Sequence, residues 1–228
     1  MAKRPIFIPS HHENSLLETE FIDFQWHPGI SVSQKQKSIK SLHTSAEECL
    51  GLKSILEISS KSELTIGIKL SAFNLKLTSL ENIRGSVEVF FQGSKVFSKG
   101  GPYTDLYTKS SLEAKRDQRL KNSGDLIEFC FNDIRWPTKP NIMFYTWLYL
   151  NALIQNQSLA DELLDFDAFT DIEFNPKKSI NCQAASAAIF KSLVSKSLIE
   201  YSMKSTENFI EVLSNYYSKE TMIQNTLF

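Results

Sequence analysis

The sequence predicts one α+β domain that is mainly α-helical, with a few short strands in its N-terminal half. Apolar residues recur at helical spacing over much of residues 86–228, whereas short alternating or apolar runs bounded by Pro and Gly lie before residue 76. Hydrophobic residues make up 42% of the 228 residues, and 16 residues are Phe, which is enough apolar volume for a sizeable core. One domain with additions fits this length.

The first fifty residues predict two strands and a helix. The strands lie at residues 6–8 and 21–26, and each ends before a Pro or a Pro-Gly pair. From Ser33 the apolar residues recur at helical spacing, and Gly51 follows the last of them. Ser33 can cap this helix and Gly51 can end it. Its lysines, Lys35 among them, are expected to face away from the core.

In the middle of the chain, residues 55–60 and 67–75 predict strands. Residues 87–97 predict a helix, because their apolar side chains fall on one helical stripe. Glu88 and Lys95 are about two helical turns apart on it. Both side chains would then project from the same side of the helix and could face one pocket.

Helices are predicted for most of the chain after residue 100. Ser110 and Ser111 can cap a short charged helix that continues to Leu120. Further helices are predicted at residues 141–157, 158–164 (capped by Ser158) and 186–194, and from residue 206 into the tail. No internal repeat and no Gly/Ser linker divides the chain.

Charge and cysteine content exclude several classes of protein. Lys and Arg number 25 and Asp and Glu 26, so the net charge of −1 excludes a protein that coats nucleic acid by bulk charge. Cys49, Cys130 and Cys182 form neither a CxxC pair nor a Cys/His cluster, so we expect no metal site and no disulfide scaffold. The sequence has no signal-peptide core and no membrane span, so we expect a cytoplasmic protein without a membrane partner.

The string VEVFFQGSK at residues 87–95 places a carboxylate, an amide and an ammonium group among aromatic residues. A carboxylate in apolar surroundings must find a partner or raise its pKa, and either condition suits acid–base chemistry. From spacing alone the commoner alternative is a core helix on which Glu88 and Lys95 point to water. No familiar catalytic string is present.

Two other groups of polar residues are weaker candidates. Residues 169–183 alternate acids with apolar residues, although such stretches are usually strands or loops with a solvated face. The hydroxyls and lysine of residues 59–62, together with Lys115, Arg116 and Arg119, could hold a phosphate. The alternative for the charged helix is that its cations are simply solvated.

Four strings resemble, in order and spacing, the NADAR (YbiA-like) family: LSAFN at 70–74, VEVFFQGSK at 87–95, EAKRDQR at 113–119 and DIE at 171–173. The most specific family element, Glu-x-x-Phe-Gln-x-x-Lys, matches at Glu88, Phe91, Gln92 and Lys95. The resemblance covers residues 55–195. It therefore implies a catalytic core of residues 55–195, an N-terminal extension of residues 1–54 packed on that core, and a helical tail of residues 196–228.

Three further sequence strings are similar to the branch of NADAR proteins encoded beside DarT-type toxins. They are GISVSQKQK at 29–37, GSK at 93–95 and FNPKKSIN at 174–181. Those toxins ADP-ribosylate guanine bases in DNA, and their NADAR partners remove the modification. One departure is that the family's Asp-x-x-Trp-Gly is missing, and Lys178, Ser179 and Asn181 fill that region. A catalytic Asp there is not carried over.

The resemblance implies an antitoxin N-glycoside hydrolase that removes ADP-ribose from the amino group of guanine and needs no cofactor. Its partners would be ADP-ribosylated single-stranded DNA or ADP-ribose, with the base exposed or flipped, and a cognate DarT-type toxin. Glu88 is the implied carboxylate near the anomeric carbon. Lys95 would attack the sugar to form a Schiff base, hold phosphate or pair with Glu88. Glu173 would position water or Lys95.

The resemblance also implies which residues hold the ligand. Phe91 and Trp136, which stands where the family has a Trp before a helix, would stack on the base or ribose. Hydrogen bonds would come from Ser71, Asn74 and Gln92. The pyrophosphate would be held by hydroxyls and cations, namely Ser59, Lys61, Lys115, Arg116 and Arg119.

Two other functions remain open at this point. One is a metabolic N-glycosidase of the same family that acts on a small amino-sugar phosphate. The other is a non-catalytic antitoxin that binds its toxin through the N-terminal block or through a helical face with Phe209, Leu213 and Tyr217. The plain alternative for that face is that it packs on the core.

Overall fold

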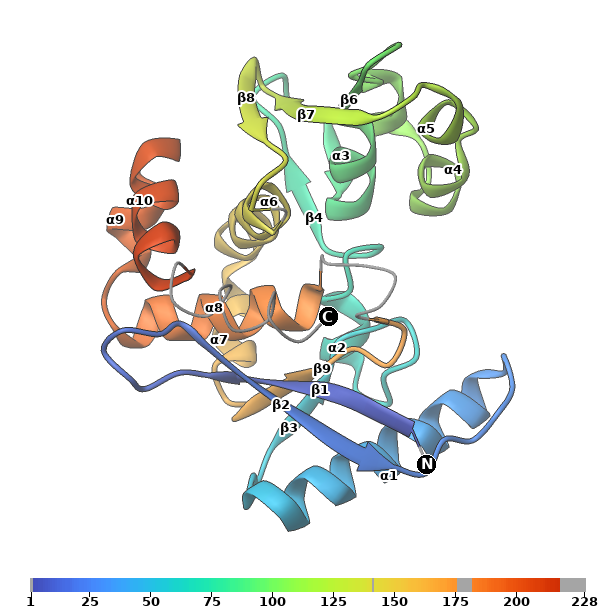
Figure 1. Cartoon of the computed structure of the whole chain (residues 1–228), viewed down its shortest axis with the longest axis vertical. Helices are drawn as coiled ribbons and strands as arrows, with labels where there is room; N and C mark the ends of the chain where they lie inside the picture. The colour runs from blue at the N-terminus through green and yellow to red at the C-terminus, as the bar shows by residue number, and fades with distance from the viewer. Residues whose placement is uncertain (1, 141, 176–181, 218–228) are drawn as a thin grey trace.

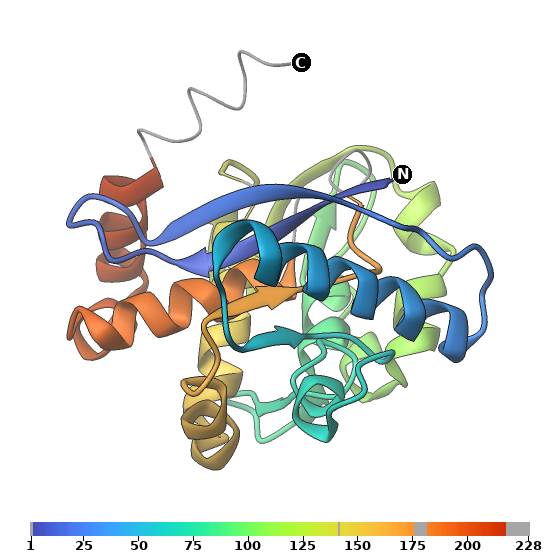
Figure 2. The same ribbon diagram turned by 90° about the horizontal axis from the view of Figure 1, so that it is seen from below.

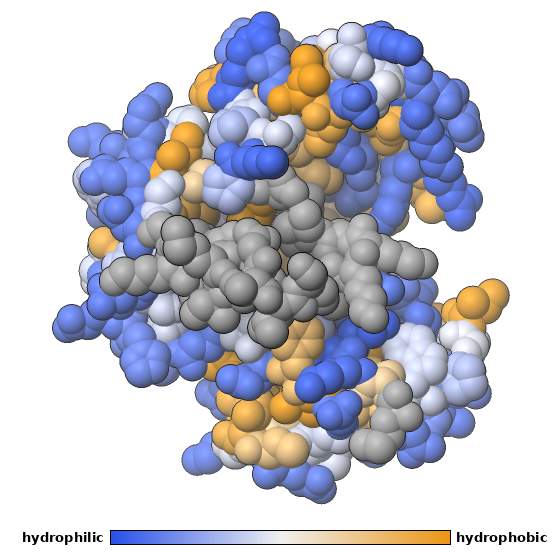
Figure 3. Space-filling view, in the orientation of Figure 1, coloured by the Kyte–Doolittle hydropathy of each residue, from blue (hydrophilic) through white to orange (hydrophobic). Residues whose placement is uncertain are grey.

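The computed structural model describes residues 2–140, 142–175 and 182–217, and it confirms the mainly helical α+β fold (Figure 1). A four-stranded sheet lies at one end of the molecule and a three-stranded sheet at the other, with helices between them. On the face shown in Figure 3, hydrophilic residues predominate and hydrophobic ones form small separate groups. Within the described ranges, no helix is both long and apolar enough to cross a membrane.

The larger sheet joins distant parts of the chain in the order β2-β1-β9-β3. Its strands are β1 (Ala2–Pro9), β2 (Leu17–Phe24), β3 (Ile55–Glu57) and β9 (Ala168–Thr170). β1 pairs antiparallel with β2 and β9, whereas β3 runs parallel to β9. Successive side chains of a strand point to opposite faces, so Ile6 and Phe7 enter two different hydrophobic cores.

Each face of this sheet is covered by a helix (Figure 2). On one face lies α1 (Val32–Leu50), and on the other lies α8 (Gln183–Ser195). The hydroxyl of Ser31 caps α1 two residues earlier than predicted, by accepting a hydrogen bond from the Gln34 amide at 3.3 Å. Gly51 ends α1 as predicted, with the left-handed φ of 68° that favours glycine.

The centre of the molecule is helical. α6 (Met143–Ile154) lies there and α7 (Gln157–Leu163) follows it, whereas α9 (Ile199–Met203) and α10 (Thr206–Tyr217) stand at one side of the molecule (Figure 1). Asn156, not Ser158, occupies the N-cap position of α7. Phe209 and Leu213 of α10 are fully buried, so this helix packs on the core as the plain alternative held. The end of the predicted tail, residues 218–228, lies outside the described residues.

The smaller elements build the other end of the molecule. They are β4 (Lys76–Thr78), β5 (Arg84–Ser86), α3 (Val87–Gly93), β6 (Lys95–Phe97), the 3-10 helix η1 (Thr104–Thr108), α4 (Ser111–Arg116), α5 (Arg119–Asn122), β7 (Leu126–Phe131) and β8 (Ile134–Pro137). Ser110 caps α4 in a capping box with Glu113. The charged helix predicted up to Leu120 is interrupted at Asp117, where the backbone leaves the helical region.

Two predicted elements are wrong. The strand predicted at residues 67–75 begins instead with the helix α2 (Thr65–Lys69). This helix brings Gly67 so close to β3 that a Cβ atom there would lie 2.0 Å from the carbonyl oxygen of Glu57. The helix predicted at residues 87–97 ends at Gly93, because the β-prone residues after it pair with β7 as strand β6.

The second half of the chain contributes strands that the pattern did not predict. β7 and β8 form a hairpin whose turn residues, Asn132 and Asp133, both have positive φ values of 50° and 61°. Such a two-residue turn matches the twist of paired strands. The apolar run before Asn132 and the Asn-Asp pair were therefore a hairpin signal.

Candidate functional site

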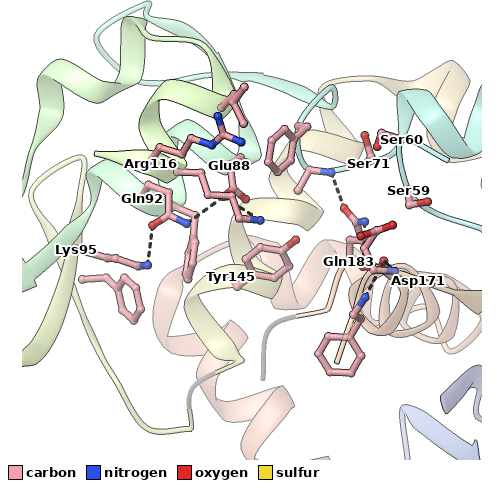
Figure 4. Close-up of a pocket in the computed structure, with 18 of the residues that line it drawn as sticks. Ser59, Ser60, Ser71, Glu88, Gln92, Lys95, Arg116, Tyr145, Asp171 and Gln183 are labelled. Atoms are coloured by element: carbon pink, nitrogen blue, oxygen red, sulfur yellow. Dashed lines mark hydrogen bonds and ion pairs between the residues drawn. The ribbon is translucent and has the colours of Figure 1, made fainter. Parts of the chain in front are cut away.

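A cavity of about 890 Å³ lies between the two ends of the molecule (Figure 4). Residues of α3, β6, α4 and β7 line one wall, and residues of the loops after β3, α2 and β9 line the other, together with the start of α8. The lining includes the aromatic residues Phe73, Phe91, Phe129, Tyr145 and Phe174. The cavity is therefore assembled from segments that are far apart in the sequence.

On the first wall, Glu88, Gln92 and Lys95 form a chain of hydrogen bonds. Gln92 lies one helical turn after Glu88 on α3, and its Nε2 donates to Glu88 Oε1 at 3.0 Å. Lys95, from β6, donates from Nζ to Gln92 Oε1 at 2.7 Å. The helix begins where Ser86 accepts a hydrogen bond from the Val89 amide. Glu88 and Lys95 thus face one cavity although the helix between them ends early.

The surroundings of Lys95 make its charged form less favourable than it is in water. Burial lowers the pKa of Lys95 to about 8; the charge of Glu88 opposes this shift and that of Lys115 adds to it. Its Nζ also lies 4.7 Å from the centre of the Phe91 ring. The cation that pairs directly with Glu88 is Lys115, at 3.9 Å from Nζ to Oε1. The Glu88 side chain is only 8% exposed.

On the second wall, Gln183 connects three segments. Its Oε1 accepts a hydrogen bond from the Ala72 amide at 2.6 Å. Its Nε2 donates to the Ile58 carbonyl oxygen at 2.6 Å and to Asp171 Oδ2 at 3.0 Å. The other oxygen of Asp171 accepts hydrogen bonds from the amides of Glu173 and Phe174. The Asp171 carboxyl group is therefore fixed against the cavity.

Behind Asp171 lies a second buried acid, Glu57. It accepts hydrogen bonds from the Thr170 hydroxyl at 2.6 Å and from the Ile172 amide at 2.9 Å. Thr170 Oγ1 is in turn 2.8 Å from His43 Nε2 on α1. Burial raises the pKa of Glu57, burial and then the charge of Glu57 raise that of Asp171, and burial lowers the pKa of His43 to about 4.

Tyr145 of α6 lines the cavity between the two walls (Figure 4). Its pKa is raised by burial and then by the charge of Glu88, with a smaller contribution from Asp171. The phenol therefore remains protonated and can donate a hydrogen bond into the cavity. No sequence pattern singles out Tyr145, because it lies in the most apolar helix of the chain.

The structure brings most of the predicted site residues together. The cavity is lined by ten of them: Ser59, Lys61, Ser71, Glu88, Phe91, Gln92, Lys95, Lys115, Arg116 and Glu173. Glu173 lies at the rim, where Lys35 Nζ approaches its Oε1 at 3.1 Å. Lys35 was expected to face solvent, but its side chain is only 14% exposed because it lies over the Trp26 ring.

Three predicted site residues do not line the cavity. Asn74 donates its side-chain amide to Ile68 O and Ser71 Oγ, and so closes a turn. Arg119 pairs with Asp105 and Asp117. Trp136 is 1% exposed and packs against aromatic residues of α6 and α10. Lys178, Ser179 and Asn181 lie outside the described residues.

Within the part of the chain that the structure describes, no cluster of three or more His, Cys, Asp or Glu residues could hold a metal ion. No curated protein sequence matches the chain. A family model described as the DarT1-associated NADAR antitoxin matches residues 2–223. This match covers both walls of the cavity as well as the N-terminal strands and helix. The protein belongs to the DarT1-associated NADAR antitoxin family.

Proposed function

We propose that the protein is an N-glycoside hydrolase that removes ADP-ribose from the amino group of guanine in DNA and so reverses a DarT-type toxin. The observation that carries this proposal is the hydrogen-bonded chain of Glu88, Gln92 and Lys95 in the wall of a large cavity. Membership of the antitoxin family supports it.

Glu88 suits the reaction at the sugar. As the bond from the ribose C1 atom to the guanine nitrogen breaks, its electron pair moves to the nitrogen and positive charge develops at C1. A nearly buried carboxylate stabilises that charge more strongly than one in water. It can also accept a proton from the water that attacks C1. Gln92 holds the carboxylate in one orientation through a hydrogen bond.

Lys95 is the second catalytic group of the proposal. An amine with a pKa of about 8 is neutral in about a tenth of the molecules at pH 7. In a second route the ribose ring opens first, and the neutral amine adds to C1 of the resulting imine; guanine then leaves with its amino group, and water hydrolyses the Schiff base to release ADP-ribose. Its hydrogen bond to Gln92 keeps the same amine next to the carboxylate that would act on C1.

The cavity also suits the rest of the ligand. Its volume of about 890 Å³ is in the range of sites for nucleotide-sized ligands. Hydroxyls and cations for a pyrophosphate are present in Ser59, Lys61 and Arg116, and Phe73 and Phe91 offer aromatic surface for a base or ribose. We do not extend this role to Trp136, because that side chain is enclosed in the core.

The test uses a single-stranded oligonucleotide that carries one ADP-ribosylated guanine, with released ADP-ribose measured by mass spectrometry. The protein should release ADP-ribose, and Glu88→Gln should lower the rate by a factor on the order of 10³. Glu48→Gln, at an exposed position of α1, is the matched control and should keep the wild-type rate.

Two other outcomes would favour the competing functions. Release from a free ADP-ribosylated nucleoside or an amino-sugar phosphate, without release from the oligonucleotide, would favour the small-molecule glycosidase. If Glu88→Gln abolished release but still neutralised the toxin in cells, the protein would act on its toxin by contact. Neither outcome is expected.

A further inference from the structure

The two carboxyl groups of the second wall, Glu57 and Asp171, lie beside each other, and neither is paired with a cation among the described residues. Glu57 is 3% exposed, whereas part of Asp171 faces the cavity. Glu173, whose charge also raises the pKa of Glu57, is paired with Lys35. Two adjacent carboxylates, one buried and one partly buried, with no cation among the described residues cannot both be ionised at low cost, so we take the pair to retain a proton.

One short stretch of chain positions both groups. The Thr170 hydroxyl and the Ile172 amide donate to Glu57, and the next two amides donate to Asp171. Gln183 fixes the remaining oxygen of Asp171. The two carboxyl groups therefore move with the same turn, and only Asp171 reaches the cavity. A proton that the pair retains is available to a ligand only at Asp171.

The position of Asp171 complements that of Glu88. The two groups project from opposite walls, with Tyr145 between them (Figure 4). The charges of both carboxyl groups add to the effect of burial in raising the pKa of Tyr145. Glycoside hydrolysis uses such a pair, in which one carboxyl group serves the sugar carbon and the other serves the leaving group.

We propose that Asp171 is the catalytic acid that protonates the leaving guanine, and that Glu57 is a positioning residue that keeps the proton on Asp171. This inference rests on the proposed function. As the C1–N bond breaks and its electron pair moves to nitrogen, that nitrogen takes the proton of Asp171. In the direct route, in which water rather than the Lys95 amine attacks C1, Glu88 accepts a proton from that water, whose oxygen bonds to C1. Solvent then returns one proton to Asp171 and removes one from Glu88.

Several titratable groups face Asp171 and enter its pH dependence. Glu57 comes from β3, Glu173 from the same turn, Cys182 from the residue before α8, and Tyr145 and Tyr149 from α6. The pKa values of both tyrosines and of Cys182 are raised, mainly by burial, so these three groups stay neutral near pH 7. Glu57 is therefore the neighbour whose removal should change the ionisation of Asp171 most.

The first test compares two leaving groups in Asp171→Asn. Release from the guanine oligonucleotide should fall by about 100-fold or more, the usual loss when a general acid is removed. ADP-ribose that carries a 4-nitrophenoxy group at C1 releases 4-nitrophenolate, which leaves without a proton. Hydrolysis of this substrate should therefore fall less than about tenfold. Asp165→Asn, at an exposed site before β9, is the control. Equal losses on both substrates would overturn the acid role.

The second test does not depend on Asp171→Asn and can be used if that variant fails to fold. Glu57→Gln removes the neighbouring negative charge but retains an oxygen that accepts hydrogen bonds. The alkaline limb of the pH–rate profile should move to lower pH while the plateau rate is kept, because Asp171 now loses its proton more readily. A limb that does not move would overturn the role of Glu57. If the wild type releases no ADP-ribose from guanine, the proposed function itself has failed.

Discussion

The two walls of the cavity are built in different ways. The first is local: Glu88, Gln92 and Lys95 lie within eight consecutive residues, and the cation Lys115 lies beside them. The second gathers Glu57, Asp171 and Gln183 from distant segments, and neither Glu57 nor Asp171 is in an ion pair in the described part of the chain. The difference indicates that the first wall can be changed with little effect on the fold, whereas changes in the second should also affect stability.

Gln183→Ala is the strongest test of this comparison. The change removes hydrogen bonds to Ala72, Ile58 and Asp171 and leaves buried partners unsatisfied, so we expect the free energy of unfolding to fall by about 2–4 kcal/mol. Urea unfolding followed by circular dichroism measures it. A loss below about 0.5 kcal/mol would mean that the second wall is not coupled to stability.

Acid pH should act on the second wall through His43. The unfolded chain binds a proton at His43 below pH 6.5, whereas the folded chain binds it only near pH 4. Stability is therefore lost as the pH falls from 6.5 to 4, by about 3 kcal/mol at most. Between pH 6.5 and pH 4, the unfolding midpoint should fall less in His43→Gln than in the wild type. In the exposed control His11→Gln it should fall as much as in the wild type.

Gln92→Ala makes the corresponding change in the first wall. It removes the hydrogen bonds to Glu88 and Lys95, so both charged groups lose their fixed orientation. We expect release of ADP-ribose to fall about tenfold and the free energy of unfolding to fall by about 1 kcal/mol. A stability loss as large as that of Gln183→Ala, measured in the same urea series, would remove the distinction between the walls.

Lys35→Met should have the smallest effect. It removes the ion pair with Glu173 and keeps an apolar side chain over Trp26. Glu173 is 46% exposed, so the stability change should stay within about 0.5 kcal/mol, with a two- to threefold lower rate of release. Lys40→Met, on the exposed side of α1, is the control, and both variants are compared by thermal unfolding and single-turnover rates.

The sequence predicts the first wall well for a physical reason. Glu88 and Gln92 share a helix face, so periodicity alone places their side chains together. Lys95 faces the same cavity from strand β6, which begins after α3 has ended at Gly93, and not from the helix that periodicity predicted. The resemblance to NADAR proteins supplied the roles of these residues, which spacing alone left open.

Periodicity and family patterns could not predict how the second wall is assembled or where the Trp136 side chain lies. Glu57 and Asp171 come together only because β3 and β9 pair in parallel, and no local period records that pairing. Trp136 precedes a helix, as the family pattern expects, but its side chain faces the aromatic core. A sequence pattern states which residue is present, whereas the direction of its side chain depends on partners elsewhere in the chain.

The place of β9 between β1 and β3 has a consequence for the order of folding. The ribosome makes β1 well before its second neighbour in the sheet, which appears only at residues 168–170. Contacts over such long sequence separations form late. A nascent chain that stops before β9 would carry the complete Glu88 motif yet no partner for Glu57. The antitoxin would thus become competent only after β9 has been made.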